Sequence, residues 1–393
     1  MTAKRATPMA ELSFSSAFPG GNGRLRAWHP EAAIAEVEIT PDPGGEEKPF
    51  LQWFCFRLWG TPGQRIKVRL INAGDAAYPR GWEDYAVVLR HGGEGWHRQP
   101  TTYAEGVLSW DAPLEGGWVD CAYFVPHDQP AIDNLLAWAS ALGAARHCWA
   151  VSCDGRPVEG LRIGKPGGTP IWVIARQHPG ETMASWASEG LIRALLDPAR
   201  DLSQRLRESF EFHIVPNMNP DGAARGYLRT NAAGTNLNRA WQDPEGLSAP
   251  EVAGVWQAMA NSGVALFLDL HGDEALPYVF TAGCEGVPGF GDGEDGARWA
   301  ARQQRFRDYL EALNPAYQQR YGYPVAPPGR ANLTMATAAV AHRFHCPAFT
   351  LEMPFKDDRN HPDPVEGWSP ARSRALGADL LPAILQTFEA ERP

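Results

Sequence analysis

The sequence has no long apolar run, no cluster of basic residues and few cysteines. Without 18 consecutive apolar residues, no transmembrane helix is predicted. The absence of Lys/Arg runs, with a net charge of −10, argues against binding to nucleic acid or to an anionic membrane surface. Six cysteines in 393 residues, none of them in a Cys-x-x-Cys pair, indicate neither a disulfide framework nor a thiolate zinc site.

The first residues, Met1 to Pro8, also lack the apolar segment of a secretory signal. The sparse cysteines fit reduced thiols in a cytosol better than an oxidising compartment. We therefore expect a cytoplasmic protein. Its 44% apolar and 21% charged residues are typical of a globular chain and exclude extensive disorder.

Its length exceeds that of one ordinary core and favours two domains. Residues 1–130 contain short alternating or apolar runs between Gly/Pro clusters, which predicts an antiparallel β-sandwich. Residues 131–393 alternate strand and helix patterns, which predicts an α/β domain with a mixed, largely parallel sheet and helices on both faces. The clearest strand patterns cover residues 171–175, 210–215, 264–270 and 348–351.

The stretch from Ile171 to Glu181 joins a buried-strand pattern to two potential metal ligands. The chain turns at Pro179, and a helical pattern follows Glu181. His178 and Glu181, three positions apart across this turn, can face one point in space. Hydrolytic zinc sites often take two histidines and one carboxylate and keep one position open for water.

Two further apolar strand patterns end in residues of the same chemistry, His271 and Glu352. The carboxyl ends of strands in open α/β sheets are where ligands bind, and a carboxylate there without a function would be costly to bury. Zinc lowers the pKa of its bound water to about 7. A nearby carboxylate can take the water's proton and deliver it to a leaving amine. The pattern predicts a catalytic zinc site with a general base.

A Gly-rich, non-helical stretch from Gly226 to Trp241 lies between the two histidines and is suited to binding an anion. Arg239 can hold a carboxylate by two hydrogen bonds, and Asn238 can add an amide donor. Arg229 can stabilise the oxyanion that forms when water adds to a carbonyl. A zinc hydrolase that also binds a free carboxylate is expected to act at a carboxyl terminus.

The order of these motifs resembles the zinc carboxypeptidases of the M14 class. It is most similar to the bacterial type of the cytosolic carboxypeptidase subfamily, whose members carry a β-sandwich before the peptidase domain. The motifs are His178-Pro-Gly-Glu181, Pro216-Asn-Met-Asn-Pro-Asp-Gly222, Arg229 with Asn238-Arg239, Asp269-Leu-His271-Gly and Thr350-Leu-Glu352. The resemblance covers essentially the whole chain, because residues 121–126 are similar to the subfamily's junction motif.

The resemblance implies one zinc ion per chain and a peptide or protein C-terminus as substrate. It implies that His178, Glu181 and His271 bind the zinc, with Glu352 as the base. It also implies that Arg229 contacts the oxyanion and that Asn238 and Arg239 bind the substrate carboxylate. A mobile tyrosine is also implied, and both Tyr321 and Tyr323 are candidates for it.

The chain differs from the eukaryotic members that trim glutamate from tubulin tails, which carry an arginine in a Thr-Ala-Arg-type motif before the final Glu. Residues 331–336 contain no arginine, which together with the acidic net charge argues against a polyglutamate substrate.

Several alternatives remain open from the sequence. Arg225 competes with Arg229 for the oxyanion role, and Arg343 or Lys356 could pair with Glu352. Asp269 could orient His271 as a metal ligand, or it could only be the hydrogen-bond partner of a structural histidine. The remaining candidates are Asp273 and Glu274 as reserve catalytic carboxylates and His342 with His345 as a second ligand pair.

Two other functions also remain. One is a zinc amidohydrolase acting on an acylated amino acid, similar to succinylglutamate desuccinylase or aspartoacylase. The other is a non-catalytic binding protein with a structural zinc. The preferred C-terminal side chain, the role of the N-terminal domain and the oligomeric state, a homo-oligomer included, stay open.

Overall fold

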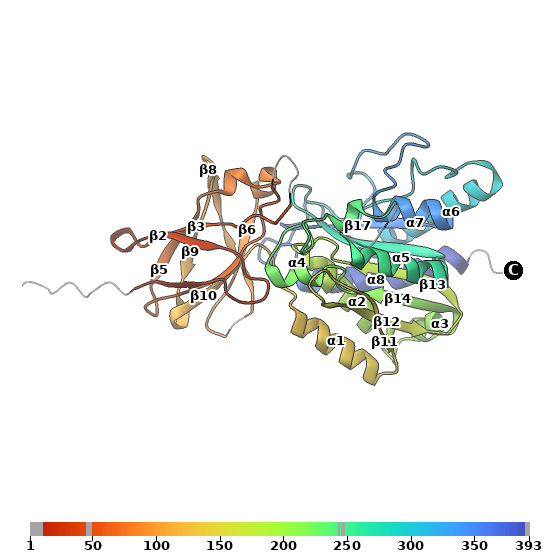
Figure 1. The fold of residues 1–393 in the computed structure, drawn as a ribbon, viewed down its shortest axis with the longest axis horizontal. Helices are drawn as coiled ribbons and strands as arrows, with labels where there is room; N and C mark the ends of the chain where they lie inside the picture. The colour runs from red at the N-terminus through yellow and green to blue at the C-terminus, as the bar shows by residue number, and fades with distance from the viewer. Residues whose placement is uncertain (1–10, 45–48, 94, 243, 245–247, 390–393) are drawn as a thin grey trace, which may run out of the picture.

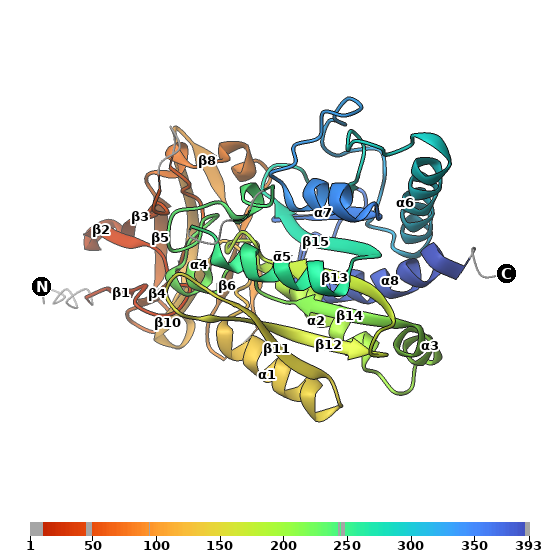
Figure 2. The same cartoon turned by 45° about the vertical axis from the view of Figure 1, so that its right-hand side comes forward.

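The chain folds into two parts that lie side by side (Figures 1 and 2). The computed structural model describes residues 11–44, 49–93, 95–242, 244 and 248–389. Residues 13–122 form a β-sandwich, called the N-terminal sandwich below, and residues 129–389 form the α/β part. None of the helices in these described ranges has the length and apolar character needed to cross a bilayer.

The N-terminal sandwich consists of two five-stranded sheets. One has the order β1 (Ser13–Ser15), β4 (Cys55–Trp59), β10 (Trp118–Ala122), β6 (Ala86–Arg90) and β7 (His97–Pro100). The other has the order β2 (Arg24–His29), β3 (Ile34–Glu38), β5 (Arg65–Leu70), β9 (Val107–Pro113) and β8 (Thr102–Ala104). Every described strand pair is antiparallel except β3 with β5. Alternate residues of β3 and β5 are buried, as expected for strands with one solvated face.

The α/β part is built on a seven-stranded mixed sheet. Its order is β11 (Ala145–Val151), β12 (Pro157–Gly164), β14 (Phe210–Val215), β13 (Thr169–Ala175), β15 (Leu266–Asp273), β17 (Ala348–Pro354) and β16 (Phe280–Ala282). The four strands from β14 to β17 are mutually parallel, and the flanking strands pair antiparallel. This arrangement confirms the mixed sheet predicted from the sequence.

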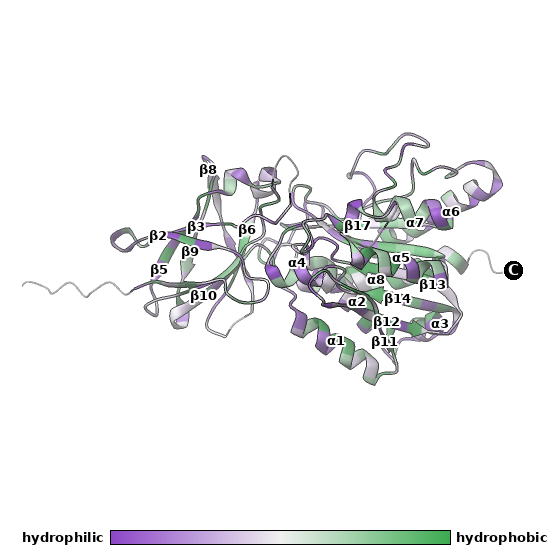
Figure 3. Cartoon of the chain, in the orientation of Figure 1, coloured by the Kyte–Doolittle hydropathy of each residue, from purple (hydrophilic) through white to green (hydrophobic). Residues whose placement is uncertain are grey.

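Helices cover both faces of this sheet, which explains why its central strands read as continuous apolar runs. Ile171 and Val173 of β13 pack with α2 and α8, whereas Trp172 and Ile174 pack with α5 and α7 on the opposite face. The apolar residues concentrate in these strands and in the helix faces against them (Figure 3). The helices are α1 (Gln129–Ala141), α2 (Thr182–Leu195), α3 (Asp201–Ser209), α4 (Pro220–Arg225), α5 (Pro250–Ser262), α6 (Gly293–Leu313), α7 (Ala336–Phe344) and α8 (Pro370–Glu389).

Helices α2 and α8 approach each other with backbone against backbone. A Cβ atom on Gly190 of α2 would lie 2.1 Å from the carbonyl oxygen of Arg374, and one on Gly377 of α8 would lie 1.9 Å from that of Ala187. Neither position has room for a side chain, so the two glycines set the spacing of this helix pair.

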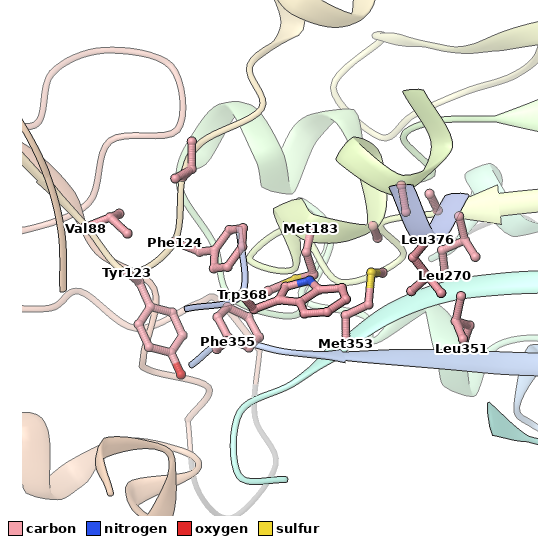
Figure 4. Packing of buried hydrophobic residues seen from close by; sticks show 14 of the residues in the cluster. Val88, Tyr123, Phe124, Met183, Leu270, Leu351, Met353, Phe355, Trp368 and Leu376 are labelled. Carbon is pink, nitrogen blue, oxygen red and sulfur yellow. The ribbon is translucent and has the colours of Figure 1, made fainter. Parts of the chain in front are cut away.

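The two parts share one continuous hydrophobic core. Tyr123, just after β10, stacks on Phe355, just after β17, with ring centroids 4.5 Å apart. Figure 4 shows the core running from Val88 through these rings and Trp368 to the interior of the α/β part. Arg98 of β7 donates across the same junction to the carbonyl oxygens of Phe355 and Trp368, both at 2.8 Å. The N-terminal sandwich is therefore packed onto the α/β part.

Candidate active site

The carboxyl ends of three parallel strands converge at one edge of the sheet. His178 follows the end of β13, His271 lies near the end of β15, and Glu352 lies in β17. The β15–β17 register places His271 directly opposite Glu352. The parallel strands thus bring together residues that lie up to 174 positions apart in the sequence.

His178, Glu181 and His271 are buried, and each directs a ligand atom to one point, all within 4.8 Å of one another. Nδ1 of His178 is 2.7 Å from Oε1 of Glu181, and Nδ1 of His271 is 2.8 Å from Oε2. The two Nδ1 atoms are 3.1 Å apart. Tetrahedral zinc with bonds of about 2.0–2.1 Å has donor atoms about 3.3 Å apart, close to these separations.

The outer nitrogen of each histidine lies close to a side-chain oxygen. Nε2 of His178 is 3.1 Å from Oδ1 of Asn236, and Nε2 of His271 is 2.8 Å from Oδ2 of Asp269. With the proton on Nε2, each Nδ1 lone pair points to the shared position. Burial, with the charge of Arg229 adding to it, lowers the pKa of His178 to about 3, so this ring stays neutral at physiological pH. Burial lowers the pKa of His271, but the negative charges of Asp269 and Glu181 outweigh it and raise the pKa well above the ordinary value, so a metal bound at Nδ1 would displace a proton from this ring. Two imidazoles and a carboxylate are ligands that fit zinc.

A buried hydrogen-bond chain continues behind His271. Trp241 donates from Nε1 to Oε1 of Gln177 at 2.7 Å, and Gln177 donates from Nε2 to Oδ2 of Asp269, also at 2.7 Å. Asp269 and Gln177 are completely buried. The chain holds Asp269 against His271, so this carboxylate is placed to orient the ring.

Glu352 is buried beside the three converging side chains and forms no ion pair with any described residue. Its Oε1 accepts a hydrogen bond from the Tyr323 hydroxyl at 3.0 Å, and its Oε2 has no hydrogen-bond partner among the described residues. The same hydroxyl lies 2.6 Å from Oδ2 of Asp273. Burial raises the pKa of Glu352 to about 8; His271 opposes this shift, while Glu181 and Asp273 add to it.

Arg229 lies in the wall of the cleft above these residues, and Arg225 does not. Arg225 is exposed and pairs with Asp154 at 2.8 Å. The guanidinium carbon of Arg229 instead lies 5.5 Å from the ring centroid of Phe50 and 5.6 Å from that of Tyr78, both in the N-terminal sandwich. The only arginine of this pair that can reach a substrate in the cleft is Arg229.

Asn238 and Arg239 lie next to each other in the same cleft. Oδ1 of Asn238 accepts from the backbone N–H of Ala336 at 2.9 Å, which turns its Nδ2 donor toward other partners. Arg239 donates from Nη1 to the carbonyl oxygen of Asn238 at 2.7 Å and is exposed at the cleft. The N–H groups of these two side chains can donate to a carboxylate that enters from solvent.

The cleft has a volume of about 790 Å³, enough for several residues of a peptide. Its lining includes His178, Glu181, Arg229, Asn238, Arg239, His271, Asp273, Tyr323 and Glu352, together with Tyr78, Glu274 and Thr350. The converging His178, Glu181 and His271 lie within it. A metal ion bound there would therefore be accessible to a substrate.

Comparisons with known proteins place this geometry in a family. Residues 14–124 match the model of the cytosolic carboxypeptidase N-terminal domain, and residues 147–372, more than half of the chain, match the model of the zinc carboxypeptidases. The chain belongs to the zinc carboxypeptidase family. It is a hydrolase of the metallocarboxypeptidase type.

Solved structures similar to this carboxypeptidase extend over both parts. The metallo-carboxypeptidase from Burkholderia cenocepacia is 38% identical, with a TM-score of 0.90 over 97% of this chain and all of that one. The metallo-carboxypeptidase from Pseudomonas aeruginosa, solved in complex with (2-guanidinoethylmercapto)succinic acid, is 41% identical, with a TM-score of 0.88 over 95% of this chain and 98% of that one. Mouse cytosolic carboxypeptidase 1 is 39% identical over 119 residues, 29% of this chain and 10% of that protein.

Most of the other residues that the sequence offered as candidates for these roles lie elsewhere in this carboxypeptidase. Arg343 stacks on Trp256, and Lys356 donates from Nζ to the carbonyl oxygen of Glu83 at 2.6 Å, so neither pairs with Glu352. His342 lies in α7, and His345 ends that helix. Of the two candidate tyrosines, Tyr323 reaches Glu352, whereas Tyr321 stacks on Tyr278.

Gln177, Trp241 and Tyr78 lie at or behind the site of this carboxypeptidase and are among the residues that sequence reasoning missed. Gln177 directly precedes the His178-Pro-Gly-Glu181 motif, and this position was the one available signal for it. Trp241 closes the Gly-rich stretch and looked like a core residue. Tyr78 comes from the N-terminal sandwich, and nothing in its local sequence points to the cleft.

Proposed function

We propose that this carboxypeptidase removes the C-terminal residue of a peptide or protein with one bound zinc ion. One observation carries the proposal. Ligand atoms of His178, Glu181 and His271 converge within 4.8 Å in a cleft that also contains Glu352 and Arg229. His178, Glu181 and His271 would hold the metal. When bound, zinc would lower the pKa of a water and polarise the scissile carbonyl.

Glu352 is proposed to take a proton from the attacking water and pass it to the leaving amine. Its Oε2 has no hydrogen-bond partner among the described residues and is available for that proton. A carboxyl whose pKa lies near the working pH can both accept and return a proton. Tyr323, which donates to Oε1, would hold the carboxyl in place during both transfers.

Arg229 is proposed to stabilise the negative charge that develops on the carbonyl oxygen, since a fixed cation in a poorly hydrated site acts strongly there. Asn238 and Arg239 are proposed to bind the terminal carboxylate of the substrate. The Pseudomonas relative was solved with a dicarboxylic acid. A carboxylate of such a compound is the group that we expect this Asn–Arg pair to bind.

The test uses a peptide with a free C-terminus and the same peptide with an amidated C-terminus. The zinc-loaded protein should release the last residue of the first peptide and leave the second intact. Equal turnover of both would contradict the carboxylate-binding role. An N-acylated amino acid in the same panel separates carboxypeptidase from amidohydrolase activity.

A second arm uses Glu352→Gln. We expect it to lower kcat by about 10²–10⁴-fold, the range for loss of a general base, while stoichiometric zinc is retained. Full activity of this variant would contradict the assignment of Glu352. A protein that binds zinc tightly but turns over no peptide in any form would instead be a binding protein.

We also propose that residues 1–130 and 131–393 are two domains and that the protein is cytoplasmic. The two family matches, which stop at residue 124 and start at residue 147, support the first point. The six cysteines, all described and all free, support the second.

A further inference from the structure

The loop that carries Arg229 belongs to the α/β part, but a carboxylate from the N-terminal sandwich holds its backbone. Oδ1 of Asp42 accepts from the N–H of Leu228 at 2.8 Å, and Oδ2 accepts from the N–H groups of Arg229 at 2.7 Å and Thr230 at 2.9 Å. Asp42 is only 6% exposed. One buried side chain thus satisfies three successive backbone donors, which fixes the path of the chain at Arg229.

The side chain of Arg229 is also confined by the N-terminal sandwich. Its guanidinium carbon lies 5.5 Å from the ring centroid of Phe50 and 5.6 Å from that of Tyr78. Aromatic faces attract a guanidinium without neutralising it. The charge therefore stays available to a substrate, while the side chain has fewer orientations.

Two backbone contacts hold the rest of this loop against the N-terminal sandwich. Asn22 donates from Nδ2 to the carbonyl oxygen of Gly226 at 2.9 Å. Gly44 and Gly234 lie back to back, since a Cβ atom on Gly44 would be 2.5 Å from the carbonyl oxygen of Gly234. The loop is therefore held on both sides of Arg229, at residues 226 and 234.

We infer that Asp42 is a positioning residue that acts through Arg229, so that the N-terminal sandwich completes the active site. The inference rests on the proposed role of Arg229 at the oxyanion. A charge stabilises a transition state only when it is fixed to within about 0.5 Å of the productive position. In this chain the elements that fix it come from the other part of the molecule.

The test is a double-mutant cycle with Asp42→Asn and Arg229→Ala, measured on the zinc-loaded full chain with an unblocked peptide. In Asp42→Asn an amide N–H₂ replaces one acceptor and faces backbone donors. We expect kcat to fall about 10–100-fold with KM changed less than threefold. In the Arg229→Ala background Asp42→Asn should change kcat less than twofold, because Asp42 acts only through the Arg229 side chain, which is then absent.

Arg98→Met is the matched control, because Arg98 bridges the same junction but contacts the segments at Phe355 and Trp368. We expect it to lower thermal stability and to leave kcat within twofold. If Asp42→Asn does not fold, Phe50→Leu takes its place, because it removes one of the two aromatic rings that lie beside the Arg229 guanidinium. We expect it to lower kcat severalfold only when Arg229 is present.

The outcomes are distinguishable. If Arg229→Ala leaves kcat unchanged, the proposed oxyanion role is wrong. If Arg229→Ala is impaired but Asp42→Asn is not, or if Asp42→Asn lowers kcat equally in both backgrounds, the positioning role of Asp42 is overturned.

Discussion

Asp269 accepts a hydrogen bond from Gln177 and, through the same oxygen, lies 2.8 Å from Nε2 of His271. The carboxylate is completely buried against that ring. The contact places a carboxylate beside Nε2 of His271, the ring nitrogen that does not face Glu181. An acceptor in this position makes a ligating imidazole more basic.

The first prediction concerns metal affinity. Asp269→Asn should weaken zinc binding about 10–100-fold, because an amide is a poorer acceptor for Nε2–H and does not raise the basicity of the ring. Competition with a chromophoric chelator measures this without any substrate. Asp379→Asn is the control. Asp379 lies on α8, where its carboxylate accepts a hydrogen bond from Asn314, and the variant should bind zinc like the wild type.

The second prediction concerns the substrate carboxylate. Arg239→Ala should raise KM for an unblocked peptide about 10–100-fold and change kcat less, since a hydrogen bond to a charged group contributes about 1.5–3 kcal/mol. Arg225→Ala provides the comparison, because its guanidinium pairs with Asp154 outside the cleft. An unchanged KM for Arg239→Ala, or an equal rise for both variants, would contradict the role given to Arg239.

The third prediction concerns pH. Burial raises the pKa of Asp42 from 3.8 to about 6, and the backbone N–H groups of Leu228, Arg229 and Thr230 oppose that shift only in part. The folded state therefore binds this proton more tightly than the unfolded chain. The contribution of Asp42 to the free energy of unfolding is greatest below pH 3.8 and is lost as the pH rises through 6.

Between pH 5 and pH 7 this contribution should fall by about 1 kcal/mol. Asp42→Asn removes the ionisable group, so urea unfolding of the wild type and of the variant at several pH values isolates the effect. The wild type should lose stability relative to the variant as the pH rises. A difference that moves the other way would show that the hydrogen bonds outweigh burial.

The fourth prediction concerns cooperativity. Because Tyr123 stacks on Phe355 within one continuous core, the two parts should unfold in a single thermal transition. Phe355→Ala should destabilise the chain by about 3–5 kcal/mol, as for other large buried rings. Calorimetry checks both points. Two separate transitions in the wild type would show that the stack does not couple the parts.

The sequence predicted the centre of the α/β sheet well. Phe210–Val215 was predicted with its observed bounds, because aromatic and β-branched residues predominate in it although Glu211 and His213 interrupt them. Strand β12 (Pro157–Gly164) was missed, since its apolar residues are separated by Glu159, Gly160 and Arg162. Short edge strands such as β8, which is exposed throughout, carry no apolar signal at all.

The residues of the candidate site were likewise predicted only in part. His178, Glu181, His271 and Glu352 were found because parallel strands end at one edge, so a local pattern at each end predicts a shared location. Asp42 was not found, because its partners lie 186 to 188 positions away and its own surroundings look like a turn. Contacts between distant loops depend on the packing of the two parts, which periodicity does not encode.

The spacing between α2 and α8 has a consequence for the proposed metal ligands. Helix α2 begins at the residue after Glu181, and Gly190 and Gly377 decide how near its axis can come to α8. A methyl group added at Gly377, remote from the cleft, would clash with the backbone of α2 at Ala187 and push α2 away from α8. Glu181, the carboxylate proposed to bind zinc, would be displaced although no residue of the site had been altered.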